Sequence, residues 1–326
     1  MGENTGFSER QLAIIEKIFD APGRPEGDAI VIGDRKIPVR DGVILLDEAV
    51  GAGEALKGDV IRSFGNEWQA FADLKPEHQL EFDCYFDVVN VPQLSGKSVI
   101  DLGCGMGRWS RILMDRTAPD FLVCVDLSDA IFVARENLRD RDNVLFIKAD
   151  LERLTFPGFR FDFAFSLGVL HHIPAGIETA VGNIHGYAAR FLCYLYYSLE
   201  NRGLAFRLLF GAATLVRKVL SSIGHEGSRR FLSWLIAVFV YKPLTLIADL
   251  AGALGLNKER VPLNAYCGFS IGRIQQDAYD RFFTKVEHRF SRADIRRIFS
   301  PYWDDVRISD IQPFWHFLCD GRRERQ

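Results

Sequence analysis

Short apolar runs alternate with amphipathic stretches through the middle of the chain. Apolar residues at helical spacing over 108–116 and 129–139 predict two helices. The runs between them are rich in Val, Ile, Leu and Phe without polar alternation, which is typical of strands buried on both faces of a sheet. Strands that alternate with helices build a doubly wound α/β sheet. The expected strands are the run around 99–102, Phe121–Asp126, Val144–Asp150, Phe161–Ser166 and Phe191–Tyr197.

The last part of the chain is expected to complete this sheet. Ser291 is placed to cap a helix that runs to Phe299, with Asp294 reaching back to its start. Val306–Ile308 and the run 314–318 are then the final two strands, the last one antiparallel to the others.

A long insertion, at about residues 198–285, separates the fifth strand from this helix. Leu204–Leu220 and Phe231–Leu256 are predicted to be strongly apolar helices with basic residues interspersed. The run Phe231–Tyr241 has only eleven residues before Lys242–Pro243, too few to span a bilayer. We expect a helical cap that encloses a substrate. The alternatives are a dimer interface, a surface that rests on a membrane, and a hairpin that only closes the core.

The chain before residue 61 is expected to form a small α+β module, and residues 61–326 the main domain. Ser8 and Gln11 have the spacing of a capping box at the start of a short amphipathic helix. Ala29–Ile32 and Lys36–Leu46 then predict two or three short strands joined by Gly-Asp and Asp-Gly turns.

A glycine-rich loop directly after the first predicted strand is the most informative motif. Asp101 precedes Gly103, Gly105 and Gly107, so the phrase is D-x-G-x-G-x-G. Glycines let a backbone approach a ligand closely, and the loop opens a helix whose first N–H groups have no partner within the helix. An acid at the end of the strand suits a ligand with a cationic group. The next strand also ends in an acid, Asp126, which is suited to the two hydroxyls of a ribose.

These motifs resemble the class I S-adenosylmethionine-dependent methyltransferases, in their small-molecule subgroup with C-G-M-G-R at 104–108 and G-V-L-H-H at 168–172. The resemblance implies a Rossmann-like sheet of seven strands, mostly parallel, and S-adenosylmethionine as the cofactor. It places the carboxylate of Asp150 at the adenine amino group and the backbone N–H that follows it at the ring. The cofactor-binding residues it implies are Asp101, Gly103, Cys104, Gly105, Gly107, Asp126, Leu127, Asp150, Leu151 and Ser166.

The N-terminal strands resemble a zinc-ribbon-like module that precedes some of these enzymes. The cysteines that hold zinc in that module are missing here, so no metal is expected. A plain hairpin packed on the main domain is the alternative.

The resemblance also implies a direct displacement at the methyl group, for which positioning of the acceptor supplies most of the acceleration. An oxygen acceptor must lose a proton, and His171 or His172, at the end of the fourth strand, is the candidate base. A structural histidine is the competing interpretation of either one. Residues expected to line the substrate are Trp68, Tyr85, Tyr279 and His288. We therefore expect methyl transfer to a small or lipophilic organic acceptor, with O-methylation slightly favoured.

Composition limits the alternatives. The net charge is −3, whereas residues 190–260 hold ten Lys or Arg and four Asp or Glu, a local charge of +6. A tRNA or rRNA methyltransferase that uses this basic insertion is thus an alternative, although the acidic whole argues against nucleic acid as a partner. A non-catalytic S-adenosylmethionine-binding protein is the other. The six cysteines form no C-x-x-C pair and no secretion signal is visible, so a cytoplasmic enzyme is expected.

Overall fold

The computed structural model describes residues 6–47, 58, 76–200, 203–258, 261–284, 286–311 and 315–323. It divides into two compact units. The first combines Met1–Ser198 with Val286–Gln326, and the second is Leu199–Lys285. Trp68 and the aromatic stretch around it lie outside the described residues.

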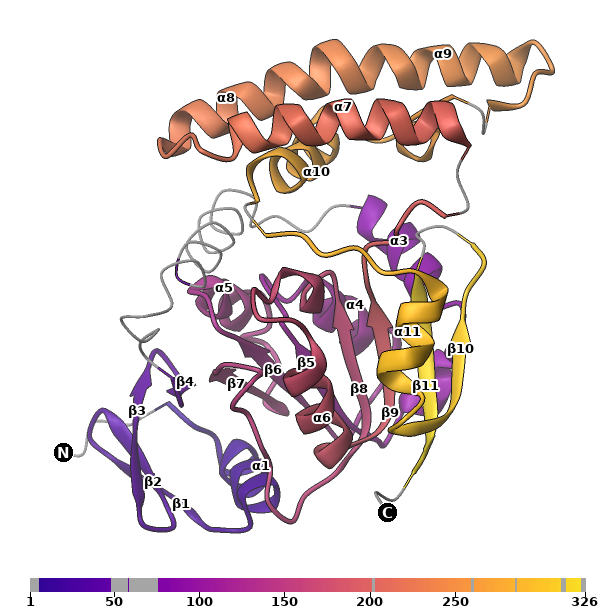
Figure 1. Cartoon of the computed structure of the whole chain (residues 1–326). Helices are drawn as coiled ribbons and strands as arrows, with labels where there is room; N and C mark the ends of the chain where they lie inside the picture. The colour runs from indigo at the N-terminus through magenta and orange to yellow at the C-terminus, as the bar shows by residue number, and fades with distance from the viewer. Residues whose placement is uncertain are drawn as a thin grey trace. The chain divides into compact units, whose positions relative to one another are not determined.

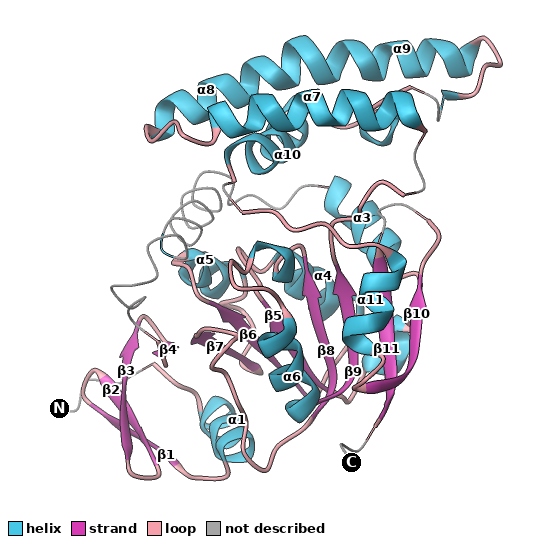
Figure 2. Ribbon diagram, in the orientation of Figure 1, coloured by secondary structure: helices cyan, strands magenta, loops and turns pink. Residues whose placement is uncertain are grey.

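A mixed sheet runs through the first unit, with helices on both faces (Figures 1 and 2). Its order is β1-β2-β3-β4-β7-β6-β5-β8-β9-β11-β10. Strands β4 to β9 are parallel in their pairings across the centre, and β11 is antiparallel to both β9 and β10. The strands are β1 (Gly23–Glu26), β2 (Ala29–Ile32), β3 (Arg35–Arg40), β4 (Val43–Leu45), β5 (Ser98–Leu102), β6 (Phe121–Asp126), β7 (Val144–Lys148), β8 (Phe161–Leu167), β9 (Ala188–Tyr194), β10 (Trp303–Ile308) and β11 (His316–Arg322).

Alternate residues of the central strands belong to two hydrophobic cores, one on each face of the sheet. Ile100 lies in one core and Val99 in the other, because successive side chains of a strand point to opposite faces. The first core is completed by α1 (Glu9–Phe19), α6 (Glu178–Tyr187) and α11 (Arg292–Phe299), and the second by α3 (Glu77–Tyr85), the 3₁₀ turn Val91–Leu94, α4 (Arg108–Arg116) and α5 (Ala130–Asn137).

The α/β class is as predicted, but the sheet has eleven described strands where seven were expected. The difference lies at the N-terminal end. Strand β4 is buried on both faces and pairs in parallel with β7, with Val43 opposite Phe146. This pairing satisfies the open edge of β7, and the hairpins of β1 to β4 extend the sheet from there. The N-terminal residues therefore continue the main sheet, and Ile15 and Ile18 of α1 are fully buried in its core.

The second unit is helical. It comprises α7 (Leu204–Leu220), α8 (Glu226–Ile236), a π-helical turn (Ala237–Tyr241), α9 (Lys242–Ala253), the 3₁₀ turn Asn264–Tyr266 and α10 (Ile271–Phe283). The helix predicted over Phe231–Leu256 is observed as a continuous helix from Glu226 to Ala253. The eleven-residue run before Lys242–Pro243 is therefore only part of a longer apolar helix. A proline has no N–H to donate within a helix, and the π turn directly before it changes the bonding pattern where that donor is missing.

Candidate active site

The glycine loop lies at the carboxyl end of β5, as predicted. The N–H groups of Gly103 and Cys104 donate to the carbonyl of Val125 at 2.7 and 2.9 Å. The N–H of Gly105 donates to Asp126 Oδ2 at 2.8 Å. The loop is therefore tied to the end of the neighbouring strand β6 before α4 begins at Arg108.

The structure explains two of the three glycines by packing within the protein. All three have positive φ, which only glycine adopts readily. A Cβ on Gly103 would lie 2.5 Å from both methyl groups of Val169, and one on Gly107 would lie 3.1 Å from the Cβ of Ala134. Close approach of the backbone to a ligand, the reason inferred from sequence, is thus not needed to account for these two positions.

Asp101 is almost completely buried at the end of β5. Its Oδ2 accepts a hydrogen bond of 2.7 Å from Ser110 Oγ on α4. Among the described residues, no donor reaches Oδ1. Burial raises the pKa of Asp101 to about 8, and the nearby charge of Asp126 adds to the rise, while the Ser110 hydrogen bond and Arg108 oppose it. Ser110 was not foreseen from the sequence.

Asp126 lies beside the loop at the end of β6. Its Oδ1 accepts hydrogen bonds from the N–H and hydroxyl of Ser128 at 2.8 and 2.7 Å. Burial raises the pKa of Asp126, although the bonds from Ser128 and Gly105 and the charge of Lys148 oppose the rise. Leu127, next in the chain, is half-buried.

Asp150 follows the end of β7, where it stabilises its own turn. Its Oδ1 accepts the N–H of Glu152 at 3.0 Å, and its backbone N–H donates to Asp47 Oδ2 at 2.9 Å. Leu151 is buried beside it. Asp47 closes β4, so the N-terminal strands contribute a carboxylate to the end of β7. This contact was not foreseen from the sequence, because the two acids are 103 residues apart in the chain.

Ser166 and Cys104, two further cofactor-binding residues implied by the resemblance, have buried side chains. Ser166 is fully buried, and its hydroxyl donates to the carbonyl of Leu102 at 2.8 Å, which joins β8 to β5. Burial raises the pKa of the Cys104 thiol well above its ordinary value, so Cys104 remains a neutral apolar side chain.

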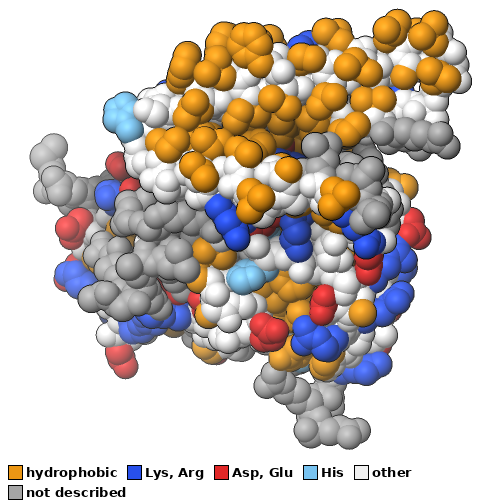
Figure 3. Space-filling model, turned by 45° about the horizontal axis from the view of Figure 1, so that its top comes forward, with side chains coloured by type: hydrophobic (Ala, Val, Ile, Leu, Met, Phe, Trp, Pro, Cys, Tyr) orange, Lys and Arg blue, Asp and Glu red, His pale blue; other side chains and the backbone are white. Residues whose placement is uncertain are grey.

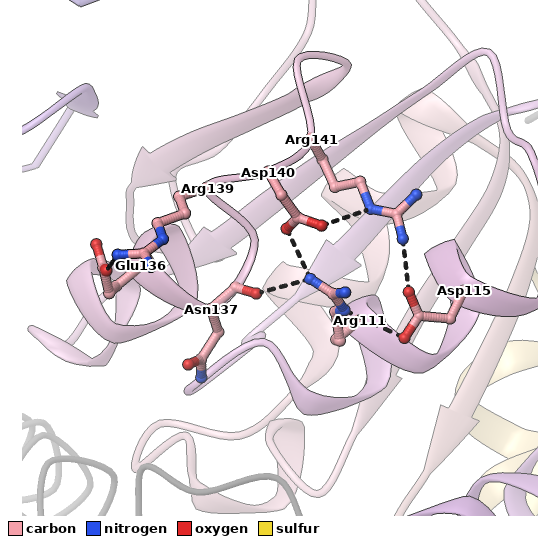
Figure 4. Close-up of polar contacts among 7 residues, drawn as sticks. All are labelled: Arg111, Asp115, Glu136, Asn137, Arg139, Asp140 and Arg141. Atoms are coloured by element: carbon pink, nitrogen blue, oxygen red, sulfur yellow. Dashed lines mark hydrogen bonds and ion pairs between the residues drawn. The ribbon is translucent and has the colours of Figure 1, made fainter.

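A polar network fixes the far side of the loop (Figure 4). Asn137, at the end of α5, donates from Nδ2 to the carbonyl of Met106 in the loop at 2.9 Å. The carbonyl of Asn137 in turn accepts from Arg111 of α4 at 3.2 Å, and Arg111 also pairs with Asp115 and Asp140. The loop is thus held between α4 and α5 by residues that the sequence did not single out.

Aromatic rings from three elements gather at the same edge of the sheet. The ring of Tyr85 lies 5.3 Å from that of Trp109 and 5.0 Å from that of Tyr194. Tyr196 stacks on His171 at 3.9 Å between ring centroids. Tyr85 was predicted here, whereas Tyr194 and Tyr196 were missed. Their signal was present, since both stand at alternate positions where the predicted fifth strand ends.

The two adjacent histidines differ in their surroundings. His172 Nδ1 donates to the carbonyl of Val286 at 2.6 Å, which fixes this ring and makes Nε2 its acceptor nitrogen. His171 is fully buried, and neither ring nitrogen has a hydrogen bond of normal geometry among the described residues. Burial lowers the pKa of His171 well below its ordinary value, and His172, Arg289 and His288 lower it further, while the Tyr194 carbonyl opposes them. His288 lies alongside, and its N–H donates to the carbonyl of His171 at 2.9 Å.

Tyr279 belongs to the other unit. It is buried on α10, and its hydroxyl donates to Glu226 Oε2 at 2.7 Å. Burial and this carboxylate raise the pKa of Tyr279. Its described contacts therefore place it in the interior of the helical unit.

Comparison with known proteins bears on this edge of the sheet. Residues 99–189 match a family model described as a methyltransferase domain. The ubiquinone biosynthesis O-methyltransferase of Coxiella burnetii is 28% identical over 109 residues, which are 33% of this chain. The match spans 46% of that enzyme, so the chain covers less than half the length of the curated relatives it matches.

Several solved structures are similar at low TM-scores. The pyocyanin biosynthetic protein PhzM is 12% identical with a TM-score of 0.44, over 73% of this chain and 54% of that one. Magnesium protoporphyrin IX methyltransferase from Synechocystis PCC 6803, with bound SAH, is 15% identical with a TM-score of 0.42, over 85% and 90% of the two chains. Residues 99–189, which carry the glycine loop, Asp101, Asp126 and Asp150, are thus similar to a methyltransferase domain.

Proposed function

We propose that this chain transfers a methyl group from S-adenosylmethionine to a small apolar or aromatic acceptor, with an oxygen atom favoured. The observation that carries the proposal is the buried Asp101 carboxyl beside the glycine loop, at the same sheet edge as the rings of Tyr85, Tyr194 and Tyr196. A charged donor and an apolar acceptor need these two surroundings side by side.

The residues present fit the donor. The carboxyl of Asp101 is almost completely buried and its Oδ2 accepts the Ser110 hydrogen bond, which leaves Oδ1 to pair with the ammonium group of the amino-acid part. Asp126 sits one strand further along and suits the ribose hydroxyls. Asp150 and Leu151 would hold the adenine. When bound, S-adenosylmethionine supplies a methyl group on a positively charged sulfur.

The chain's own residues supply position and a dry environment. Displacement at a sulfonium disperses charge, so aromatic surroundings with little water do not oppose it. The rings of Tyr85, Tyr194 and Tyr196 give a planar acceptor faces to stack on, typically at about 0.5–1.5 kcal/mol for each aromatic pair. Alignment of the acceptor with the donor then lowers the activation free energy by several kcal/mol, on the order of what the effective molarities of well-oriented intramolecular reactions correspond to.

His171 is our candidate base. Its depressed pKa keeps the ring neutral at neutral pH, the state in which it accepts a proton from an acceptor hydroxyl. His172 is held by Val286 and orients the turn that carries His171. The name of the Coxiella burnetii relative, an O-methyltransferase, supports oxygen as the acceptor atom.

The first experiment is calorimetric titration of the protein with S-adenosylmethionine, beside the Asp101→Asn variant. We expect micromolar binding that the variant loses. A folded wild-type protein that does not bind would contradict the proposal. The next step is a screen with methyl-labelled donor against phenolic, lipophilic and tRNA acceptors. Donor binding without turnover on any of them would favour a non-catalytic binding protein, and labelled tRNA the RNA enzyme.

Once an acceptor is known, His171→Gln and His172→Gln separate the two histidines. Loss of a general base costs about 10²–10⁴-fold in kcat, so His171→Gln should lower kcat to this extent with little change in KM. His172→Gln should act mainly on stability. Equal kcat values for His171→Gln and the wild type would show that His171 is not the base.

A further inference from the structure

The long helix of the helical unit buries mostly small and polar residues. Along the continuous helix Glu226–Ala253, one residue in every three or four is buried. This inner stripe consists of Arg229, Ser233, Ala237, Tyr241, Thr245 and Ala248. It is small or polar at five of its six positions, counting alanine as small, where a helix on a water-soluble core normally buries Leu, Ile and Phe.

The packing of α10 explains this stripe. Helix α10 contacts α7, α8 and the π turn, and its own buried residues include Arg273, Gln276 and Tyr279. A hydrogen bond of 2.7 Å from the hydroxyl of Tyr279 to Glu226 Oε2 crosses from α10 to α8. Gln275 of α10 likewise donates to the carbonyl of Arg230 at 3.0 Å. The small and polar stripe of the long helix therefore packs against α10, which buries Ile274 and Phe283 beside its polar residues.

The opposite sides of α7 and of the Glu226–Ala253 helix are apolar and exposed (Figure 3). On α7 they carry Leu208, Leu215, Val216 and Val219. On the longer helix they carry Phe231, Trp234, Phe239, Leu246 and Leu250, and Leu254 follows directly after its last residue. Each of these ten side chains, which we call the apolar face, is between 42% and 69% exposed. Of the sixteen large apolar side chains exposed in the described part of the chain, fourteen belong to this unit.

An apolar face of this extent indicates contact with an apolar medium or partner. The helix Glu226–Ala253 is long and apolar enough to cross a membrane, because an 18-residue stretch within it has a mean hydropathy of 1.8. Its inner stripe argues against crossing, because a helix surrounded by lipid is apolar on all sides. Helix α10, on the inner side, carries Asp277, Asp280 and Arg281, which are half-buried near Tyr241 of the inner stripe. One apolar side and one polar side suit a unit that lies flat in the surface of a bilayer.

Charge decides between a bilayer and a second copy of the chain. Residues 199–285 contain twelve Lys or Arg and six Asp or Glu, so the unit has a charge of +6, whereas the whole chain has −3. Lys218 and Arg230 are exposed next to residues of the apolar face. Two copies that met through this face would bring like charges together, whereas anionic headgroups complement them. We propose that the apolar face binds the surface of a membrane that contains anionic lipids. This interaction surface does not depend on the proposed methyl transfer.

The test uses the full chain and vesicles of phosphatidylcholine, with or without phosphatidylglycerol. We expect co-sedimentation that is stronger with the anionic vesicles. Leu215→Glu and Leu250→Glu should each reduce binding at least about tenfold. Each variant lacks an apolar side chain that the wild type inserts into the bilayer, and adds a negative charge that anionic lipids repel. Lys218→Glu should weaken binding to the anionic vesicles by at least about fivefold. Leu80→Glu, at a residue 64% exposed on α3, is the matched control and should bind like the wild type.

Trp234 reports contact with lipid directly. It is 42% exposed, whereas Trp109, Trp303 and Trp315 are buried. Brominated acyl chains should quench part of the fluorescence in the wild type, and Trp234→Phe should lose that part. Circular dichroism and donor binding check that each variant is folded.

Four results would overturn the proposal. The protein could stay in the supernatant with both kinds of vesicle, or bind both equally. Sedimentation velocity could show a dimer that Leu250→Glu dissociates, which would assign the face to a second copy. Retention in cell membranes after alkaline carbonate extraction would show a spanning helix.

Discussion

Replacement of Asp101 by Asn should have opposite effects on stability and on donor binding. Burial raises the pKa of Asp101 from its ordinary 3.8 to about 8. Between these values the folded protein keeps a proton on Asp101 that the unfolded chain has released. The free energy of unfolding therefore falls as the pH rises through this window. Asn is neutral throughout, and its carbonyl still accepts the hydrogen bond from Ser110.

The size of the effect follows from the width of the window. Each pH unit between the two pKa values corresponds to about 1.4 kcal/mol. Asp101→Asn should match the wild type in stability near pH 4 and exceed it by on the order of 5 kcal/mol at pH 8 and above. The stabilised variant should at the same time lose donor binding, because only a carboxylate can pair with the cationic ligand.

Urea denaturation of both proteins at several pH values between 4 and 9 measures the first effect. Calorimetry measures the second. With a pKa of about 8, roughly one tenth of Asp101 is ionised at pH 7, so donor affinity should rise about tenfold from pH 6 to pH 7 and level off above pH 8. Binding at pH 7 should release nearly one proton, detected in buffers of different ionisation enthalpy. If Asp101→Asn still binds weakly, the pH dependence of that binding measures the titration of the ligand's own amino group.

Parallel stability curves for the two proteins between pH 5 and pH 8 would refute this reasoning. They would mean that Asp101 is ionised in the folded state and that burial does not dominate its titration. Donor affinity independent of pH, with no proton release, would lead to the same conclusion.

Two further substitutions test how the glycine loop is held. Gly103→Ala should lower stability by about 2–5 kcal/mol, through positive φ and collision with Val169. Val169→Ala in the same chain should restore part of this loss, and no recovery in urea denaturation would show that the collision is not its cause. Asn137→Ala removes the bond to the Met106 carbonyl, so it should cost about 1 kcal/mol and weaken donor binding about fivefold. Arg139→Ala is the control for Asn137→Ala in calorimetry. It breaks an exposed ion pair with Glu136, so it should change stability and the free energy of donor binding by no more than about 0.5 kcal/mol.

Local chemistry made the central elements predictable. Helix α4 and strand β6 have the bounds expected from the sequence, because apolar period and charge placement change sharply at their ends. Ser8 and Ser291 both form the capping boxes predicted for α1 and α11. Such signals lie within three or four residues of one another, and no tertiary contact is needed to establish them.

Contacts between distant residues decided what the sequence did not show. The N-terminal strands looked like a separate module because their own pattern says nothing about β7, the open edge that β4 covers. The eleven-residue run before Lys242–Pro243 was judged too short to span a bilayer, but the helix that contains it extends from Glu226 to Ala253, with a π turn at Ala237–Tyr241 directly before this pair. Neither outcome follows from local propensity.

The candidate site divides in the same way. The position of Asp101, the glycines and Asp126 at the ends of consecutive parallel strands was predictable, since strand direction and loop chemistry are encoded locally. The chemistry of these groups, in contrast, depends on how the chain packs around them. Burial sets the pKa of Asp101 and of His171, and burial depends on every element packed around the sheet edge. The helical unit shows the same division. Its apolar residues were evident in the sequence, but the packing of α10 against α7 and α8 determines which of them face outward.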